Sequence, residues 1–198
     1  RTLSGAVDLR MYLPEAEFEL LFASRNNITG EALYPPIPMV EESTAAHLRQ
    51  AYEIFRADGY TIKVYDAYRP KSAQFKLYDA VQNGWFIANP YNGNSWHQLG
   101  RAIDMSLIDL KTGKELVMPT PMHTFSNDAA RFNSKQWSDV VRENMEYMTK
   151  VMLESGFTLL STEWWHFQYE GAGGSLNVDM DLDALPAHPV WEYDFDAE

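Results

Sequence analysis

The chain contains no cysteine among its 198 residues. This absence excludes disulfides, thiolate catalysis and every zinc site that uses cysteine ligands. Any transition-metal site must therefore be built from carboxylates and from the five histidines.

Positive charge is scarce. Sixteen basic residues stand against 28 acidic ones, which gives a formal net charge of −12. A field of this sign repels phosphate backbones and anionic membranes, so we expect no nucleic-acid partner. The chain also lacks an apolar run of the ~18 residues that a membrane span needs, so we expect none. A small peptide substrate is compatible with this charge, and the oligomeric state is left open.

The first residue is Arg1 rather than Met, and no apolar signal segment follows it, so the start fits removal of an upstream segment. Together with the absence of cysteine, this start leads us to expect an exported protein of the cell envelope. A cytoplasmic location is the alternative.

Hydrophobic residues make up 45% of the chain, enough for a packed core. Periodicity and turn residues predict strands at residues 5–12, 60–66, 102–107, 157–160 and 164–169. They predict helices that begin after Ser43 and end near residue 58, and at residues 71–82 and 136–155. Because these strands and helices do not alternate as regular βαβ units, we expect a single α+β domain with a mainly antiparallel sheet and flanking helices. We assign residues 1–170 to this domain and residues 171–198 to an acidic surface tail.

The first candidate site lies in residues 95–104, which read SWHQLGRAID. A loop delivers His97, and a strand then carries Asp104 on the face opposite Ile103 and Met105. An imidazole and a carboxylate are thus brought close together. Alone, the motif also fits a surface loop, because two-ligand patterns often occur by chance.

The second candidate site is the segment 163–167, EWWHF. Two tryptophans and a phenylalanine around His166 indicate a buried strand, and a buried histidine needs hydrogen-bond partners or a metal. Glu163 and His166 would point to opposite faces of an ideal strand. Glu163 must therefore lie in the bend before the strand if the two are to meet. The alternative is a core histidine bonded to backbone, with Glu163 in solvent.

The two segments together match the needs of a hydrolytic zinc site. Zinc in hydrolases commonly has three nitrogen or oxygen ligands and one open position. His97, Asp104 and His166 can supply the three ligands. Glu163 then remains free to accept a proton from metal-bound water.

A second positive group would further stabilise an oxyanion. Arg69 is the best candidate, because it directly follows the strand at 60–66. The alternative is an ordinary ion pair of Arg69 with Asp66.

Three segments carry a family resemblance: YDAYRP at 65–70, SWHQLGRAIDMSL at 95–107 and EWWHF at 163–167. In this order and spacing they resemble the D-alanyl-D-alanine dipeptidases of the VanX type, a branch of the zinc D,D-peptidases. Residues 26–34 also resemble that branch, and the likeness runs from Val7 to Phe167. It implies the small α+β D,D-peptidase fold, one zinc per chain and D-alanyl-D-alanine as substrate.

The resemblance also implies a role for each matching residue. The zinc ligands are His97, Asp104 and His166, the catalytic base is Glu163, and the transition-state arginine is Arg69. The candidate substrate-binding residues are Ser95, Tyr34 and His123.

His123 marks a departure from the family. The dipeptidases have an acid at this place, which is associated with the free amino group of the substrate. Either Asp128, five residues on, restores such an acid, or the pocket accepts a longer, acylated substrate. We expect a dipeptidase. The alternatives are a D,D-carboxypeptidase acting on peptidoglycan stems and a non-catalytic wall-binding or zinc-binding module of the same fold.

Overall fold

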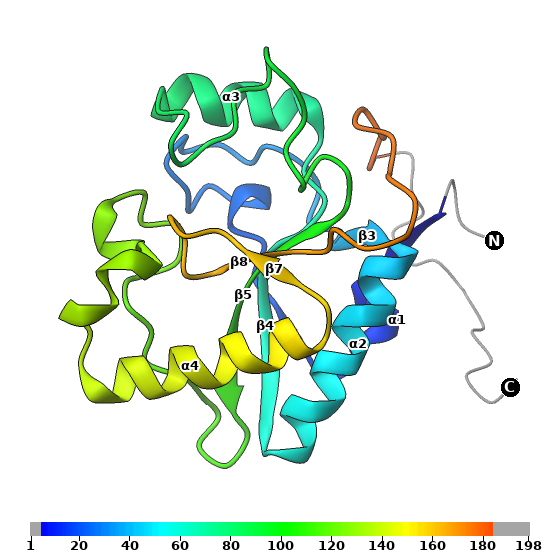
Figure 1. The fold of residues 1–198 in the computed structure, drawn as a ribbon. Coiled ribbons are helices and arrows are strands. Elements are labelled where there is room, and N and C mark those ends of the chain that lie inside the picture. Colours follow the sequence, from blue (N-terminus) through cyan, green and yellow to red (C-terminus); the bar gives the residue numbers. More distant parts are fainter. Residues whose placement is uncertain (1–4, 184–198) are drawn as a thin grey trace, which may run out of the picture.

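The computed structural model describes residues 5–183 (Figure 1). A six-stranded sheet forms its centre, with the strand order β2-β4-β5-β8-β7 and with β6 paired to β5. Only the β2–β4 pairing is parallel within this sheet, which confirms the expected α+β class and the mainly antiparallel sheet. The strands of the sheet are β2 (Glu17–Phe18), β4 (Tyr60–Asp66), β5 (Ala102–Asp109), β6 (Lys114–Glu115), β7 (Thr158–Leu159) and β8 (His166–Gln168).

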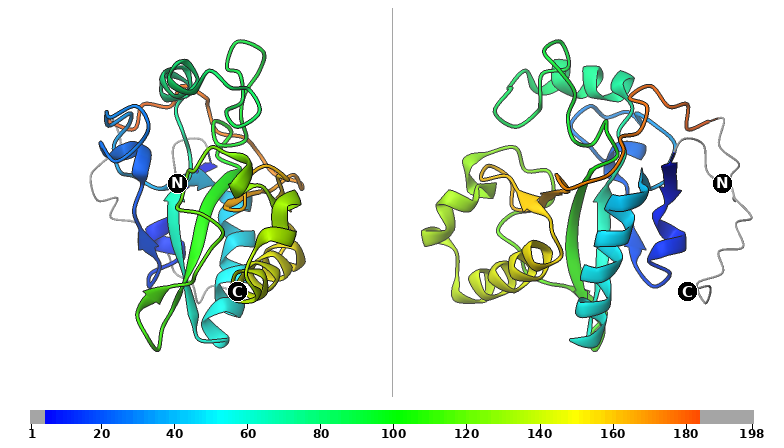
Figure 2. Two further views of the ribbon diagram at one scale, coloured as in Figure 1. Left: turned by 90° about the vertical axis from the view of Figure 1, so that its left-hand side faces the viewer. Right: turned by 45° about the vertical axis from the view of Figure 1, so that its right-hand side comes forward.

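Two long helices, α2 (Glu42–Ala57) and α4 (Asp139–Glu154), cover one face of the sheet, and the N-terminal segments lie across the other (Figure 2). A third helix, α3 (Lys71–Val81), lies beyond one end of the sheet. A separate two-stranded ribbon pairs β1 (Ala6–Asp8) with β3 (Met39–Glu41). In the described residues, none of the helices is both long and apolar enough for a membrane crossing.

The alternation of side chains along β5 divides the core from the site. Ile103, Met105 and Leu107 are fully buried in the main core, which α2 and α4 also line. Asp104 lies on the opposite face, as its place in the strand predicts. The long β4–β5 pairing therefore presents a carboxylate on the side away from the two helices.

Two local predictions were wrong. Residues 9–12 were expected to continue a strand, but they form the short helix α1 (Leu9–Tyr12). The side chain of Asp8 ends the strand, because it accepts a 2.9 Å hydrogen bond from the backbone nitrogen of Arg10 and caps the helix. Helix α4 begins at Asp139 rather than at residue 136, because Ser138 is its N-cap.

The segment after residue 170 packs against the body of the protein over its described part. Leu176 and Leu182 are buried in a second apolar cluster. The backbone nitrogen of Leu176 donates to the carbonyl of Leu99 at 2.9 Å, and that of Lys71 donates to Val178 at 2.8 Å. The domain boundary at residue 170 stays a prediction, and residues 184–198 of the expected tail lie outside the described residues.

Candidate metal centre

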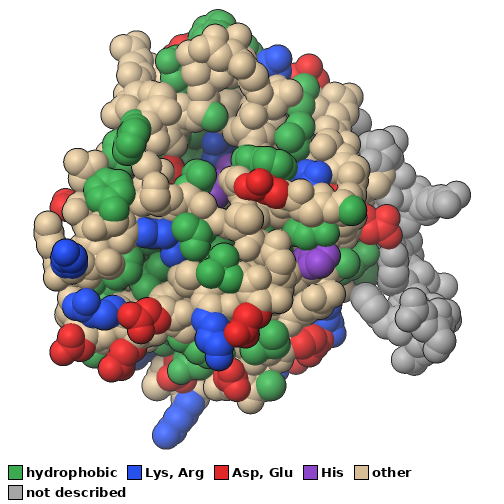
Figure 3. All heavy atoms as spheres, in the orientation of Figure 1, with side chains coloured by type: hydrophobic (Ala, Val, Ile, Leu, Met, Phe, Trp, Pro, Cys, Tyr) green, Lys and Arg blue, Asp and Glu red, His purple; other side chains and the backbone are tan. Residues whose placement is uncertain are grey.

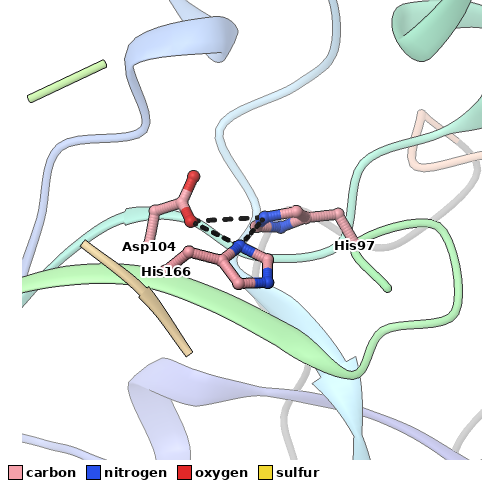
Figure 4. A group of neighbouring side chains, drawn as sticks. All are labelled: His97, Asp104 and His166. Carbon is pink, nitrogen blue, oxygen red and sulfur yellow. Dashed lines mark hydrogen bonds and ion pairs between the residues drawn. The ribbon is translucent and has the colours of Figure 1, made fainter. Parts of the chain in front are cut away.

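Three candidate ligands meet where β8 pairs with β5, two inner strands of the sheet. Asp104 and His166 are direct cross-strand partners, so the antiparallel register itself places their side chains side by side. His97 comes from the loop that precedes β5, and its side chain points toward the other two (Figure 4). All three side chains are buried. The structure therefore brings together the two segments that the sequence singled out.

The distances between the candidate ligand atoms fit a tetrahedral metal ion. His97 Nε2 and His166 Nδ1 lie 3.2 Å apart, and they lie 3.3 Å and 3.2 Å from Asp104 Oδ1. Zinc–ligand bonds of about 2.0–2.2 Å at tetrahedral angles separate the ligand atoms by roughly 3.3–3.6 Å. The observed triangle is thus close to the size that one zinc ion needs.

The outer hydrogen bonds of the two imidazoles fix which nitrogen faces the centre. His97 Nδ1 lies 2.7 Å from the carbonyl oxygen of Ala67, and His166 Nε2 lies 3.0 Å from Gln168 Oε1. Both oxygens can only accept, so these ring nitrogens carry the protons. His97 Nε2 and His166 Nδ1 therefore present lone pairs to each other and to Asp104. Such a convergence of acceptors fits a cation, and the outer contacts are those that orient metal-binding histidines.

Asp104 has the ionisation that a metal ligand requires. Burial acts to raise the pKa of this carboxyl group, but the surrounding imidazoles, foremost that of His97, outweigh burial and hold the pKa well below its ordinary value. Oδ1 faces His97 and His166, whereas Oδ2 lies 2.9 Å from His123 Nε2. The carboxylate thus presents one oxygen to the candidate metal position.

Glu163 lies beside this triangle without belonging to it. Because β8 begins only at His166, Glu163 lies in the bend before the strand, as its expected meeting with His166 required. Its Oε2 is 3.9 Å from His166 Nδ1, and the residues whose ligand atoms lie within 4.8 Å of one another do not include it. Burial raises the pKa of Glu163 to about 7. A carboxylate with such a pKa can accept and return a proton near neutral pH.

Arg69 supplies a fixed positive charge. Its Nε donates to Asp66 Oδ2 at 2.9 Å, one terminal nitrogen donates to Gln74 Oε1 at 2.8 Å, and the other lies 4.0 Å from Asp104 Oδ2. Burial opposes the charged form, but Asp66 and Asp104 outweigh it and raise the pKa of Arg69. The ion pair with Asp66, which the sequence left open as an alternative role for Arg69, is present and holds the guanidinium in place. Tyr34 contributes indirectly, because its hydroxyl donates to Asp66 Oδ1.

These groups line one cleft of about 310 Å³, at the lower end of the range for small-molecule sites. Figure 3 shows a hollow in the surface in which histidine (purple) and basic (blue) side chains are visible. Ser95 and His123 also line the cleft, whereas Tyr34 does not. Asp128 is exposed on the 3₁₀ helix Asn127–Ala129 and does not line it either. The apolar wall includes Phe86, Ile87, Phe125, Leu160 and Trp165.

Two glutamines complete the site and were not expected from the sequence. Gln168 holds His166, and its own Nε2 donates to Glu170 Oε1. The contact of Gln168 with His166 could have been predicted, because residues two apart on a strand share a face. Gln98 is fully buried and accepts a 2.7 Å hydrogen bond from the backbone nitrogen of Ser95, which shapes the loop of His97. A loop contact of this kind leaves no periodic signal.

Comparison with known proteins places the chain in a family. The family model described as D-ala-D-ala dipeptidase matches residues 2–184. The chain belongs to this family. It is therefore a peptidase of the D-Ala-D-Ala dipeptidase family, as the resemblance implied.

Named relatives agree with this membership. The chain is 29% identical over 163 residues to the D-alanyl-D-alanine dipeptidase of Escherichia coli (strain K12), covering 82% of this chain and 83% of the relative. It is 27% identical over 189 residues to the D-alanyl-D-alanine dipeptidase of Enterococcus faecalis (strain ATCC 700802 / V583), covering 83% and 91%. A solved structure of the LdcB LD-carboxypeptidase aligns over 86% of this chain and 70% of its own, at 17% identity and a TM-score of 0.48.

Proposed function

We propose that this peptidase is a zinc enzyme that hydrolyses the dipeptide D-alanyl-D-alanine in peptidoglycan precursor metabolism. The observation that carries the proposal is the triangle of His97 Nε2, His166 Nδ1 and Asp104 Oδ1, with sides of 3.2–3.3 Å. The names of the two dipeptidase relatives support the choice of substrate.

The chain's own residues divide the chemistry among them. Zinc, held by His97, Asp104 and His166, would act as a Lewis acid that acidifies water and polarises a carbonyl oxygen. Glu163, buried beside the three ligands, accepts the proton of the attacking water and returns it to the leaving amine. Arg69 faces the oxyanion that forms on the scissile carbonyl. Its guanidinium needs little reorganisation, because Asp66 and Gln74 already hold it.

A hydrolysis panel tests this proposal. Zinc-loaded protein should cleave D-Ala-D-Ala and leave L-Ala-L-Ala intact, and a chelator should abolish the cleavage until zinc is restored. Metal analysis of the same sample should give one zinc per chain. Cleavage of D-Ala-D-Ala that survives complete removal of the metal would overturn the proposal.

One observation favours a second candidate, a D,D-carboxypeptidase acting on longer peptidoglycan stems. Among the described residues that line the cleft, the only carboxylates are Asp104 and Glu163, and both already have roles. The lining therefore offers no further carboxylate for the ammonium group of a dipeptide. Such a group needs an opposite charge when it is removed from water. An acylated amino end would have no such need.

Comparison of D-Ala-D-Ala with its N-acetyl derivative separates the two candidates. A dipeptidase should cleave the free dipeptide with a much higher kcat/KM, because acetylation removes the charged amino end and adds bulk. Comparable kcat/KM values for the two, together with cleavage of a pentapeptide stem, would favour the carboxypeptidase.

A further inference from the structure

His123 has an unusual backbone conformation. Its φ is 56°, and among the described non-glycine residues only Gln82 shares a positive φ. Gln82 is the C-cap of α3, where the left-handed conformation is common. His123 lies in the irregular segment between β6 and the 3₁₀ helix Asn127–Ala129, so helix capping does not explain it. A non-glycine residue persists in this region when its surroundings fix it, which is frequent at functional sites.

The surroundings hold the His123 ring on three sides. It stacks on Phe22 with centroids 4.4 Å apart and planes 12° apart, and it lies parallel to Phe125 at 6.0 Å. The ring of Trp165 meets it edge-on at 5.6 Å. Only 7% of the side chain is exposed. The imidazole can therefore turn little, and the direction of Nε2 is set by packing.

Nε2 of this fixed ring lies 2.9 Å from Asp104 Oδ2. Because a carboxylate that binds zinc carries no proton and can only accept, His123 donates this hydrogen bond at the proposed site. The two oxygens of Asp104 therefore have different partners. Oδ1 lies with His97 and His166, and Oδ2 is engaged by His123.

We propose that His123 is a positioning residue for the metal-binding carboxylate, which it orients so that Asp104 binds zinc through Oδ1 alone. This inference rests on the proposed zinc site. His123 itself is not among the residues whose ligand atoms converge, so it acts through Asp104. Its Nε2 is already engaged, which leaves only Nδ1 for the substrate contact that the sequence suggested.

A matched pair of variants tests the donor separately from the ring. Both His123→Gln and His123→Met replace the imidazole by a flexible chain of similar length, and both meet the same backbone strain at φ 56°. Only glutamine retains an N–H group near the position of Nε2. Zinc dissociation constants, measured by competition with a chromogenic chelator, are the readout, and thermal melts of the zinc-free variants report folding.

We expect the methionine variant to bind zinc about 10- to 100-fold more weakly than the wild type, as is usual when an outer partner of a metal ligand is lost. The glutamine variant should recover most of that affinity. Equal affinity of the methionine variant and the wild type, or equal weakness of both variants, would overturn the inference while leaving the zinc site intact. A wild-type protein that binds no zinc would overturn the proposed function as well.

A measurement on the wild-type protein keeps the test independent of variant folding. In zinc-loaded protein with ¹⁵N-labelled histidine, His123 should carry a proton on Nε2 that correlates with a hydrogen bond. A neutral His123 with its proton on Nδ1 would remove the donor and refute the inference.

Discussion

Glu163→Gln removes a negative charge from the cleft while keeping the shape of the side chain. Glu163 is 5% exposed, and burial raises its pKa from the ordinary 4.5 to about 7. Without zinc, the folded protein therefore retains the Glu163 proton up to about pH 7, whereas the unfolded chain loses it near pH 4.5. The folded state binds more protons between these values, so stability falls as the pH rises through this window. At pH 8 the ionised group costs the zinc-free fold about 3 kcal/mol.

The glutamine variant does not carry this cost. We expect the zinc-free variant to gain stability relative to the wild type as the pH rises, by about 2–3 kcal/mol between pH 5 and pH 8. For a chain of this length, the difference in melting temperature should grow by roughly 5–10 °C over that range. Thermal melts of chelator-treated proteins at the two pH values measure it. A difference that does not change with pH would refute burial of an ionisable group as its cause.

The zinc-loaded form of the same variant tests the role of Glu163 in the chemistry. Glu163 is not among the converging ligand atoms, so the variant should retain one zinc per chain. Its kcat for D-Ala-D-Ala should fall by about 10²- to 10⁴-fold, because the attacking water loses its proton acceptor. Loss of zinc from the variant would instead make Glu163 a ligand, and the assigned roles would have to be exchanged.

Four further substitutions address the remaining groups of the site. His97→Ala and His166→Ala should each abolish stoichiometric zinc binding. Both should also lower the melting temperature measured in excess zinc, because metal binding is linked to folding. Full zinc occupancy in both variants would reject the ligand assignment. Arg69→Ala should lower kcat more than it raises KM, as steady-state kinetics will show, because the contact is strongest in the transition state. Gln168→Leu removes the acceptor for His166 Nε2 and should weaken zinc binding by about 10- to 100-fold in chelator competition.

Much of the fold and site could be predicted because it depends on local pattern. The alternation of β5 sets Ile103 against the core and Asp104 against the cleft, and a period of two residues is visible in any sequence. The bend at Glu163 followed from the same rule, since a residue three before His166 could join it only outside a regular strand. These inferences needed no knowledge of which segments meet in space.

The remaining parts depend on contacts between distant segments, which sequence spacing does not encode. Tyr34 was expected to contact substrate, yet its hydroxyl donates to Asp66, 32 residues away. His123 was considered as a partner for the substrate's amino group, yet its Nε2 donates to Asp104, 19 residues away. In both cases the residue type allowed several partners. The tertiary packing selected one of them.

The loop of His97 illustrates how tertiary contacts complete a site whose other two ligands come from the sheet. Asp104 and His166 are positioned by register alone, because a slip of one residue would turn either side chain to the other face. His97 has no such support and depends on Gly100, whose φ of 69° favours glycine and whose carbonyl accepts a 2.8 Å hydrogen bond from Glu41. A Cβ at Gly100 would lie 2.5 Å from the side chain of Leu176.

The close packing at Gly100 brings the segment after residue 170 into contact with the loop that carries His97. Leu176 is buried, and its backbone nitrogen donates to Leu99, two residues after His97. A side chain added at Gly100 must therefore displace the Leu176 side chain or the loop itself, since the backbone of Glu41 closes the other side at 3.0 Å. The third candidate ligand, His97, is thus positioned by chain segments on both sides of its loop, so the geometry of the candidate metal centre depends on residues well beyond the motifs that reveal it.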